Sequence, residues 1–182
     1  AYHLSKGLTV QEALHFLTVR ELADRLVTGE ITSVDLTRMY LDRAEQLDPP
    51  PFDLPSEPRN DHDGKLSTMV TIARDHALES AERADAELRA GRRRSILHGV
   101  PYGVKDLLDT DGIRTTWGSG IFRDRVPLRN AAVIDKLRES GAVLMAKMSL
   151  GEFAGGNTSS ALNPWKLDRT SFGSSSGTVA AT

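Results

Sequence analysis

The most informative stretch of this 182-residue chain reads Ser171-Phe172-Gly173-Ser174-Ser175-Ser176-Gly177-Thr178. Four serines and two glycines in these eight positions, followed by Val179-Ala180-Ala181, predict a tight loop that leads into a helix. Because the first N–H groups of a helix have no partner inside it, such a loop can bind an anion or an oxyanion. A flexible connection without chemical function has the same composition, so this stretch alone leaves both interpretations open.

Upstream lies a second stretch that bears on this choice, Gly99-Val100-Pro101-Tyr102-Gly103-Val104-Lys105-Asp106. Residues Tyr102 to Leu107 are predicted to form a strand, with Lys105 near its end. Burial disfavours the charged form of a lysine, so a lysine surrounded by uncharged residues can accept a proton near neutral pH. An ion pair between Lys105 and Asp106 is the alternative, although neighbouring residues on a strand point to opposite faces.

Together the two stretches resemble the amidase signature family, in which a strand ends in G-V-K-D and a later G-G-S-S-G-G loop leads into an alanine-rich helix. By this resemblance Lys105 matches the family's catalytic lysine, and Ser174 matches its bridging serine, which follows a cis peptide bond. The segment Asn163-Pro164-Trp165 resembles the family's sequence ahead of the serine loop. The resemblance extends from about Leu17 to the end of the chain.

The resemblance implies an amidase, a hydrolase that cleaves a carboxamide other than a peptide bond to an acid and an amine or ammonia. In this family a serine nucleophile forms an acyl-enzyme, an oxyanion hole stabilises the intermediate, and the bridging serine relays protons between nucleophile and lysine. The nucleophilic serine is expected beyond residue 182, so this chain is expected to be the N-terminal part of one amidase signature domain. By itself we expect it to be inactive, and the remainder of the same enzyme or a second chain would complete the site.

The resemblance also assigns roles to residues around the two motifs. The residues that match the family's substrate-contacting loop, in a shortened form, are Gly155, Gly156 and Asn157. Gly173 leaves room for the geometry ahead of the bridging serine, and Ser175 is expected to have a structural role within the loop. Phe172 and Ser176 depart from the pattern, because the family has glycine at both positions and a side chain restricts the backbone.

The composition excludes several classes of function. The chain has 23 basic and 25 acidic residues and a net charge of −2, so nothing indicates a nucleic-acid surface. It has no cysteine, which excludes disulfides, zinc–thiolate sites and cysteine nucleophiles. No apolar run approaches the ~20 residues of a membrane span. We therefore expect a soluble, cytoplasmic protein that binds a small-molecule amide, with no cofactor, no metal, no nucleic acid and no membrane; a homodimer stays open.

Two helices are predicted near the N-terminus. Thr18 and Glu21 form a capping box, and Gly29 ends the helix that follows. Ser33 is predicted to cap a second helix, which Pro49 stops. Residues 1–48 are thus expected to form a helical arm, residues 49–65 a proline-rich loop, and residues 66–182 the start of an α/β core.

Strands and helices alternate after residue 65. The expected elements are a strand at Met69–Ile72, a helix at Ala73–Ala90, the strand at Tyr102–Leu107, a helix from a cap at Asn130 to Ser140, and a strand at Ala142–Ala146. The last of these has no polar alternation, so both of its faces should be buried. The pattern predicts an α/β fold with a mixed, largely parallel sheet flanked by helices, an incomplete amidase signature fold.

Three functions are compatible with these observations. The first is the amidase, the second is the amidase subunit of a tRNA-dependent amidotransferase, and the third is a non-catalytic domain in which Lys105 and the serine loop bind an anion. A histidine base is the other way to activate a serine. Of the five histidines, His98 alone lies near the Lys105 strand, and we expect it to be a strand-edge or core residue.

Overall fold

The computed structural model describes residues 14–48, 66–155 and 160–182. Its first long helix, α2 (Val19–Thr28), begins with the predicted capping box. The Glu21 backbone N–H donates to the Thr18 hydroxyl over 3.3 Å, and the Thr18 N–H donates to the Glu21 carboxylate over 2.7 Å. Gly29 ends the helix in the left-handed conformation, with φ 74°, which glycine adopts without strain. Both predicted ends of this helix are confirmed.

The second helix, α3 (Ser33–Leu47), begins at the residue that the sequence predicts as its cap. Thr32 is the N-cap, and its hydroxyl accepts from the Asp35 N–H over 3.0 Å. The prediction that Ser33 caps this helix is therefore wrong. The Ser33 hydroxyl instead donates to the Gly99 carbonyl oxygen over 2.7 Å, and its backbone N–H donates to the Asp85 carboxylate over 2.7 Å. Ser33 thus connects α3 to two distant segments.

Asp48 follows α3 and holds two parts of the chain together. Its buried carboxylate accepts from the backbone N–H groups of Ser67, over 2.7 Å, and Thr68, and also from the Thr68 hydroxyl, over 2.9 Å. Residues 49–65, where the proline-rich loop and the helix stop at Pro49 were predicted, lie outside the described residues. The end of α3 and the start of the first strand are therefore fixed side by side.

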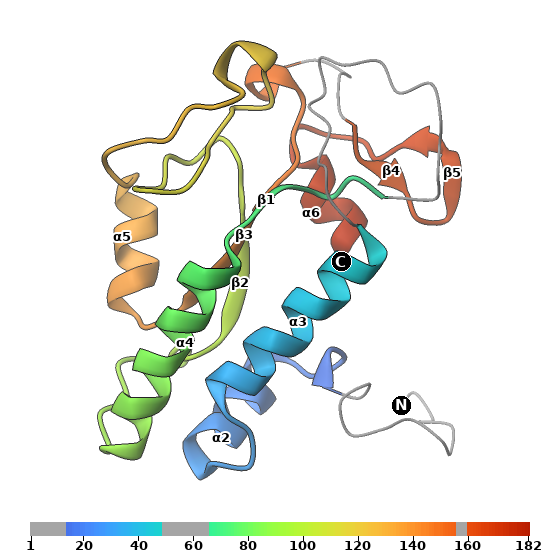
Figure 1. Cartoon of the computed structure of the whole chain (residues 1–182). Helices are drawn as coiled ribbons and strands as arrows, with labels where there is room; N and C mark the ends of the chain where they lie inside the picture. Colours follow the sequence, from blue (N-terminus) through green and yellow to red (C-terminus); the bar gives the residue numbers. More distant parts are fainter. Residues whose placement is uncertain (1–13, 49–65, 156–159) are drawn as a thin grey trace.

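The central sheet has three strands in the order β1 (Met69–Ile72), β3 (Val143–Met148), β2 (Pro101–Lys105) (Figure 1). Strand β2 pairs with β3 in parallel, and β1 pairs with β3 in antiparallel orientation. The predicted mixed sheet is confirmed, with one of these two pairings parallel. The strand predicted at Tyr102–Leu107 ends earlier, at Lys105, and the strand predicted at Ala142–Ala146 continues to Met148.

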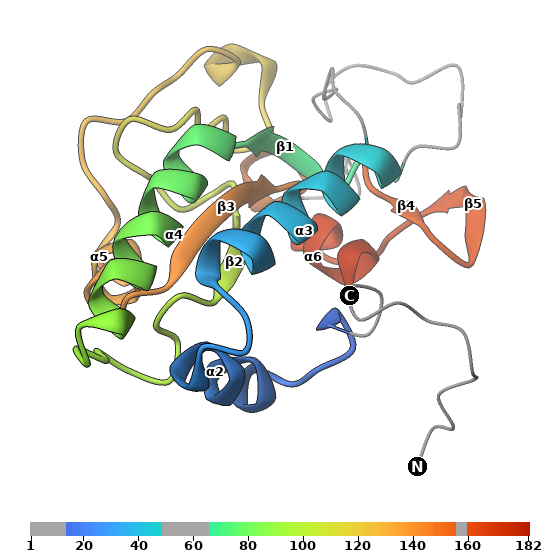
Figure 2. The same cartoon turned by 60° about the horizontal axis from the view of Figure 1, so that its bottom comes forward.

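Helices connect these strands. Helix α4 (Arg74–Arg89) follows β1, and α5 (Ala132–Glu139) lies between β2 and β3, as expected of a crossover that joins parallel strands. In both views α4 lies between α3 and α5 (Figures 1 and 2). Asn130 does not cap α5, because Ala131 occupies the N-cap position. The Asn130 side chain instead accepts from the Asp111 N–H over 2.7 Å and donates to the Asp135 carboxylate over 2.9 Å.

The core is built around β3, all six residues of which are buried. Val143 and Met145 pack in one cluster with Leu41 of α3 and with Ala77 and Ala81 of α4. The absence of polar alternation in the sequence of this strand thus reflects its central place in the sheet. One of the six buried residues of β3 has a charged side chain, Lys147.

The C-terminal part adds short elements around one end of the sheet: η2 (Glu152–Ala154), β4 (Leu162–Asn163), β5 (Lys166–Thr170) and α6 (Ser176–Ala181). The β4–β5 hairpin was not predicted; in its turn the Asn163 side chain accepts from the Trp165 N–H over 2.9 Å. A further 3-10 turn, η1 (Gly120–Phe122), precedes α5. Among the described residues no helix is both long enough and apolar enough to cross a bilayer.

Candidate active site

Lys105 and Ser174 meet at the end of the parallel strands. Lys105 is the last residue of β2, and Ser174 lies in the loop that leads into α6. The Lys105 Nζ donates to the Ser174 Oγ over 2.8 Å, although the residues are 69 positions apart in the chain. A hydrogen bond between these two groups is what the proton relay implied by the family resemblance requires. The edge where parallel strands end is also where α/β proteins commonly bind ligands.

The serine loop is held in place by its flanking residues. The Ser171 N–H donates to the Ala161 carbonyl oxygen over 2.8 Å, and its hydroxyl donates to the Leu162 carbonyl oxygen over 3.0 Å. Gly173 has φ 93°, a backbone conformation that favours glycine. These contacts fix the loop against β4 immediately before Ser174.

On the other side of Ser174, α6 packs closely against the central sheet. The Gly177 N–H donates to the Ser149 carbonyl oxygen over 3.0 Å. A Cβ atom at Gly177 would lie 2.2 Å from the Thr68 carbonyl oxygen and 2.5 Å from the Ser149 nitrogen. Glycine is therefore required here by the close approach of two backbone segments.

The two departures from the family pattern fit this loop. Neither Phe172 nor Ser176 is among the residues with positive φ, so neither position requires glycine. Phe172 is 81% exposed, whereas Ser176 is fully buried at the start of α6. Ser175 occupies the N-cap position of α6 without a side-chain capping bond. The backbone at both positions is thus one that residues with side chains adopt without strain.

Gly155 alone of the three predicted substrate-contacting residues is described. It is exposed and follows η2, whereas Gly156 and Asn157 lie outside the described residues. Immediately before it, Phe153 and Ala154 have φ of 50° and 58°, a region that costs free energy for residues with side chains. The Phe153 N–H donates to the Trp117 carbonyl oxygen over 2.9 Å, which connects η2 to the loop between β2 and α5.

Two buried charged groups beside the site were missed as functional candidates. Asp106 and Lys147 are each fully buried, and their charged groups lie 3.8 Å apart. Burial raises the pKa of Asp106, against the hydrogen bonds from Thr116 that lower it. Burial also lowers the pKa of Lys147, to about 8. Asp106 does not pair with Lys105. Its carboxylate accepts a hydrogen bond from Thr116 and faces Lys147, which agrees with the expectation that neighbouring residues on a strand point to opposite faces.

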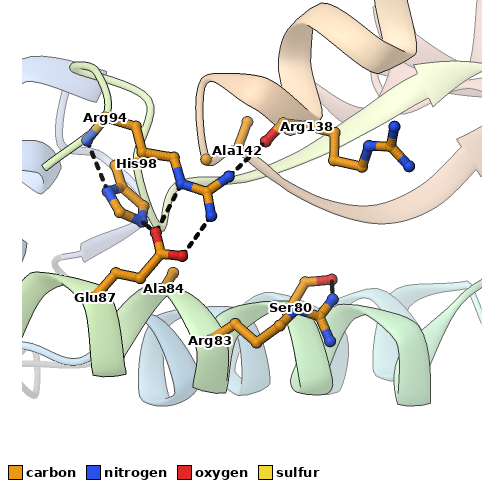
Figure 3. A pocket seen from close by; sticks show the side chains of 9 residues that line it. Ser80, Arg83, Ala84, Glu87, Arg94, His98, Arg138 and Ala142 are labelled. Atoms are coloured by element: carbon orange, nitrogen blue, oxygen red, sulfur yellow. Dashed lines mark hydrogen bonds and ion pairs between the residues drawn. The ribbon is translucent and has the colours of Figure 1, made fainter. Parts of the chain in front are cut away.

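His98 is a core residue, as expected. Its imidazole is buried, Nδ1 accepts from the Arg94 N–H over 3.0 Å, and Nε2 lies 3.2 Å from the Glu87 carboxylate (Figure 3). Burial lowers the pKa of His98, against the attraction of Glu87 that raises it. These contacts engage both ring nitrogens in a network on α4 and the segment after it.

Two cavities lie between α4 and α5. The smaller, of about 70 Å³, is lined by the His98 network together with Ser80, Arg83 and Arg138 (Figure 3). The larger, of about 270 Å³, is lined by residues that include His76, Tyr102 and Asn130. Neither is lined by Lys105 or Ser174, so the candidate site lies where these two side chains meet and not in either cavity. Within the described ranges no three His, Asp or Glu residues are grouped so as to hold a metal ion.

Comparison with known proteins identifies the family. The model of the family described as Amidase matches residues 59–182 of this chain. This chain belongs to the amidase family. Lys105, Ser174 and the contact between them all lie within the matched part, so the amidase resemblance of the sequence and the geometry of the fold agree.

Individual relatives of this amidase chain are similar along most of it. A glutamyl-tRNA(Gln) amidotransferase subunit from Heliobacterium modesticaldum is 37% identical over 174 residues, which are 92% of this chain and 33% of that protein. The corresponding subunit from Geobacter metallireducens is 39% identical over 171 residues, 91% of this chain and 32% of that protein. The structure of a peptide amidase from Stenotrophomonas maltophilia superposes with a TM-score of 0.76 at 32% identity, covering 90% of this chain and 33% of that one. The chain thus spans about a third of the length of these relatives.

Proposed function

We propose that this chain supplies the catalytic lysine and the bridging serine of an amide hydrolase, and that a serine outside these 182 residues is the nucleophile. The observation that carries the proposal is the 2.8 Å contact between the Lys105 Nζ and the Ser174 Oγ. Its support comes from the match to the amidase family and from the length of the relatives, which is about three times that of the matched segment.

The chemistry follows from this contact. In this proposal Lys105 is the base, so Ser174 donates its proton to Nζ and takes one from the hydroxyl of the nucleophilic serine. The serine oxygen then bonds to the carbonyl carbon of the amide. As the C–N bond breaks, the proton returns through Ser174 to the leaving nitrogen. A water molecule, deprotonated along the same path, releases the acid from the acyl-enzyme.

We assign the rest of the chain to one amidase domain. Residues 1–48 are its helical arm, residues 49–65 a proline-rich loop, and residues 66–182 the first part of its α/β core. The proposed substrate is a small carboxamide, and Gly155, Gly156 and Asn157 are proposed to contact it. This proposal includes a restriction to amides other than peptide amides. Because a peptide amidase is among the similar structures, peptide amides are the substrates that test this restriction.

A second function has a specific observation in its favour. The similar curated proteins include several that are named as subunits of glutamyl-tRNA(Gln) amidotransferase, at 33–39% identity. In that case the amide cleaved would be that of glutamine, and the ammonia would pass to a partner protein. The two functions share Lys105 and Ser174, and they differ in substrate and in the need for partners.

The test uses the product of the complete reading frame that encodes this chain. We expect it to release ammonia or amine from carboxamides, and Lys105→Ala or Ser174→Ala to lower kcat by several orders of magnitude. Ser175→Ala is the matched control and should keep most of the activity. The 182-residue polypeptide alone should be inactive. Glutamine, a peptide amide and a simple aliphatic amide, each assayed with and without candidate partner proteins, distinguish the two functions.

Two outcomes would overturn the proposal. Full activity in the folded Ser174→Ala variant, with loss in Ser175→Ala, would show that the wrong serine was assigned. Absence of hydrolysis of all three amides in every condition, with binding of an anion that depends on Lys105, would favour the non-catalytic alternative.

A further inference from the structure

Lys147 is a fully buried lysine outside the proposed catalytic contact. It lies on β3 beside Val104 of β2 and close to the end of both strands. Its Nζ donates to three oxygens, the Leu108 carbonyl oxygen over 2.6 Å, the Thr115 hydroxyl over 2.6 Å and the Thr110 hydroxyl over 3.1 Å. All three acceptors belong to the segment that follows β2. Lys147 therefore holds this segment against β3.

Asp106 is fixed within the same segment by its side chain and its backbone. Its Oδ2 accepts from the Thr116 N–H over 2.8 Å and from the Thr116 hydroxyl over 2.6 Å. Its N–H donates to the Met148 carbonyl oxygen over 2.9 Å, and its carbonyl oxygen accepts from the Trp117 N–H over 3.3 Å. Its Oδ1 has no hydrogen-bond partner in the part of the chain that the structure describes, and it lies 3.8 Å from the Lys147 Nζ. The charge of Lys147 thus compensates the carboxylate oxygen that no hydrogen bond satisfies.

Lys105 immediately precedes this anchored residue. Consecutive side chains at the end of a strand point to opposite sides, so a fixed inward Asp106 directs Lys105 the other way, where it meets Ser174. A lysine side chain has four flexible carbon–carbon bonds, and its amine is placed reproducibly only if the backbone that carries it is fixed. The anchoring of Asp106 provides this constraint one residue away from the catalytic amine.

We propose that the buried Asp106–Lys147 pair is the positioning element of the amidase site, which fixes the end of β2 so that the Lys105 amine meets Ser174. This inference rests on the proposed function for its catalytic consequence, and on geometry alone for the position of Lys105. A purely structural role is the alternative. Buried ion pairs are inefficient stabilisers, because replacing both partners with apolar groups of similar volume is often neutral or stabilising.

The first test measures the position of the Lys105 amine without using catalysis. The product of the complete reading frame is labelled with a trace of acetic anhydride, and the acylation of each lysine is quantified by mass spectrometry, with the exposed Lys166 as internal reference. The main variant is Asp106→Asn with Lys147→Met, which removes both charges and leaves no buried charge uncompensated. We expect the Lys105 rate relative to Lys166 to change several-fold, because a displaced amine loses its contact with Ser174.

The matched control is Asp85→Asn, which changes another buried carboxylate, on α4, that accepts from the Ser33 N–H over 2.7 Å. It should destabilise the protein but leave the relative labelling of Lys105 unchanged. Circular dichroism selects conditions in which each protein is folded. If the double variant is folded and labels Lys105 as the wild type does, the pair is structural and the proposal fails.

The second test separates binding from chemistry. A displaced amine should lower kcat by up to about 100-fold while KM changes little, because small misplacements of catalytic groups have effects of this order. An unchanged kcat in the folded double variant would contradict the positioning role. If no amide is hydrolysed by any protein, the proposed function fails, and the labelling result still decides whether the pair positions Lys105.

Discussion

Replacing Lys147 with methionine should remove a titration that changes the stability of the protein at alkaline pH. The Lys147 amine is fully buried and faces Asp106, while Asp109 and Arg125 act on it from the same segment. Methionine keeps most of the length of the side chain and cannot ionise. The variant therefore isolates the contribution of one buried charge.

The magnitude follows from the two pKa values of this lysine. Burial lowers the pKa of Lys147 to about 8 in the folded protein, from an ordinary value of 10.5. Between these values the unfolded chain holds the proton that the folded protein has released, so the free energy of unfolding rises with pH. One pKa unit corresponds to about 1.4 kcal/mol, which gives a gain of roughly 2 kcal/mol between about pH 8 and about pH 10.

Urea unfolding at several pH values across this window measures the effect. Above it a second group intervenes, because burial raises the pKa of Tyr102 to about 12 and stability falls as the unfolded tyrosine ionises near pH 10. The wild type should gain free energy of unfolding relative to Lys147→Met as the pH rises. Lys147→Met alone leaves the buried Asp106 carboxylate without its charged partner, and the double variant that also carries Asp106→Asn is the control for this effect. The same pH dependence in wild type and both variants would refute the reasoning.

Two further predictions concern packing and the acid range. A Cβ at Gly177 would lie 2.2 Å from the Thr68 carbonyl oxygen, so Gly177→Ala should lower the free energy of unfolding by about 2 kcal/mol or more. Gly155→Ala, whose Cβ would meet its nearest atom at 3.5 Å, is the matched control and should change stability little in thermal unfolding. Burial lowers the pKa of His98, so as the pH falls below the ordinary value of about 6.5 the unfolded chain takes up the proton first and stability falls. Thermal unfolding of His98→Gln should show a weaker loss on acidification, and an equal loss would assign the effect to another group.

Local signals in the sequence predicted the elements that depend on local chemistry. The capping box at Thr18 and the glycine at position 29 define α2 by contacts within one or two turns, so its ends were predicted correctly. The cap of α3 was placed one residue late, because Thr32 and Ser33 can both cap a helix and the choice depends on Gly99, a residue 66 positions away from Ser33. The β4–β5 hairpin has an exposed second strand, which leaves no alternation of apolar and polar residues to recognise.

The candidate site could be predicted in part for the same reason. Lys105 and Ser174 were found because each lies in a motif, and their contact follows from the resemblance. The burial of Lys147 could not be read from the sequence, because this lysine follows an apolar run and is covered only when the segment after β2 folds over it. The anchoring of Asp106 depends on Thr116 and Met148 in the same way.

The carboxylate of Asp48 has a consequence for the length of the chain between α3 and β1. It accepts from the backbone N–H groups of Ser67 and Thr68. The residue that follows α3 and the residues that precede β1 are therefore held together. The entropy of closing a loop grows slowly, by about 0.6 kcal/mol for each doubling of its length. The contacts of Asp48 with Ser67 and Thr68 therefore fix where β1 begins relative to the end of α3, and the closure entropy that they offset depends only weakly on the number of residues between these two points.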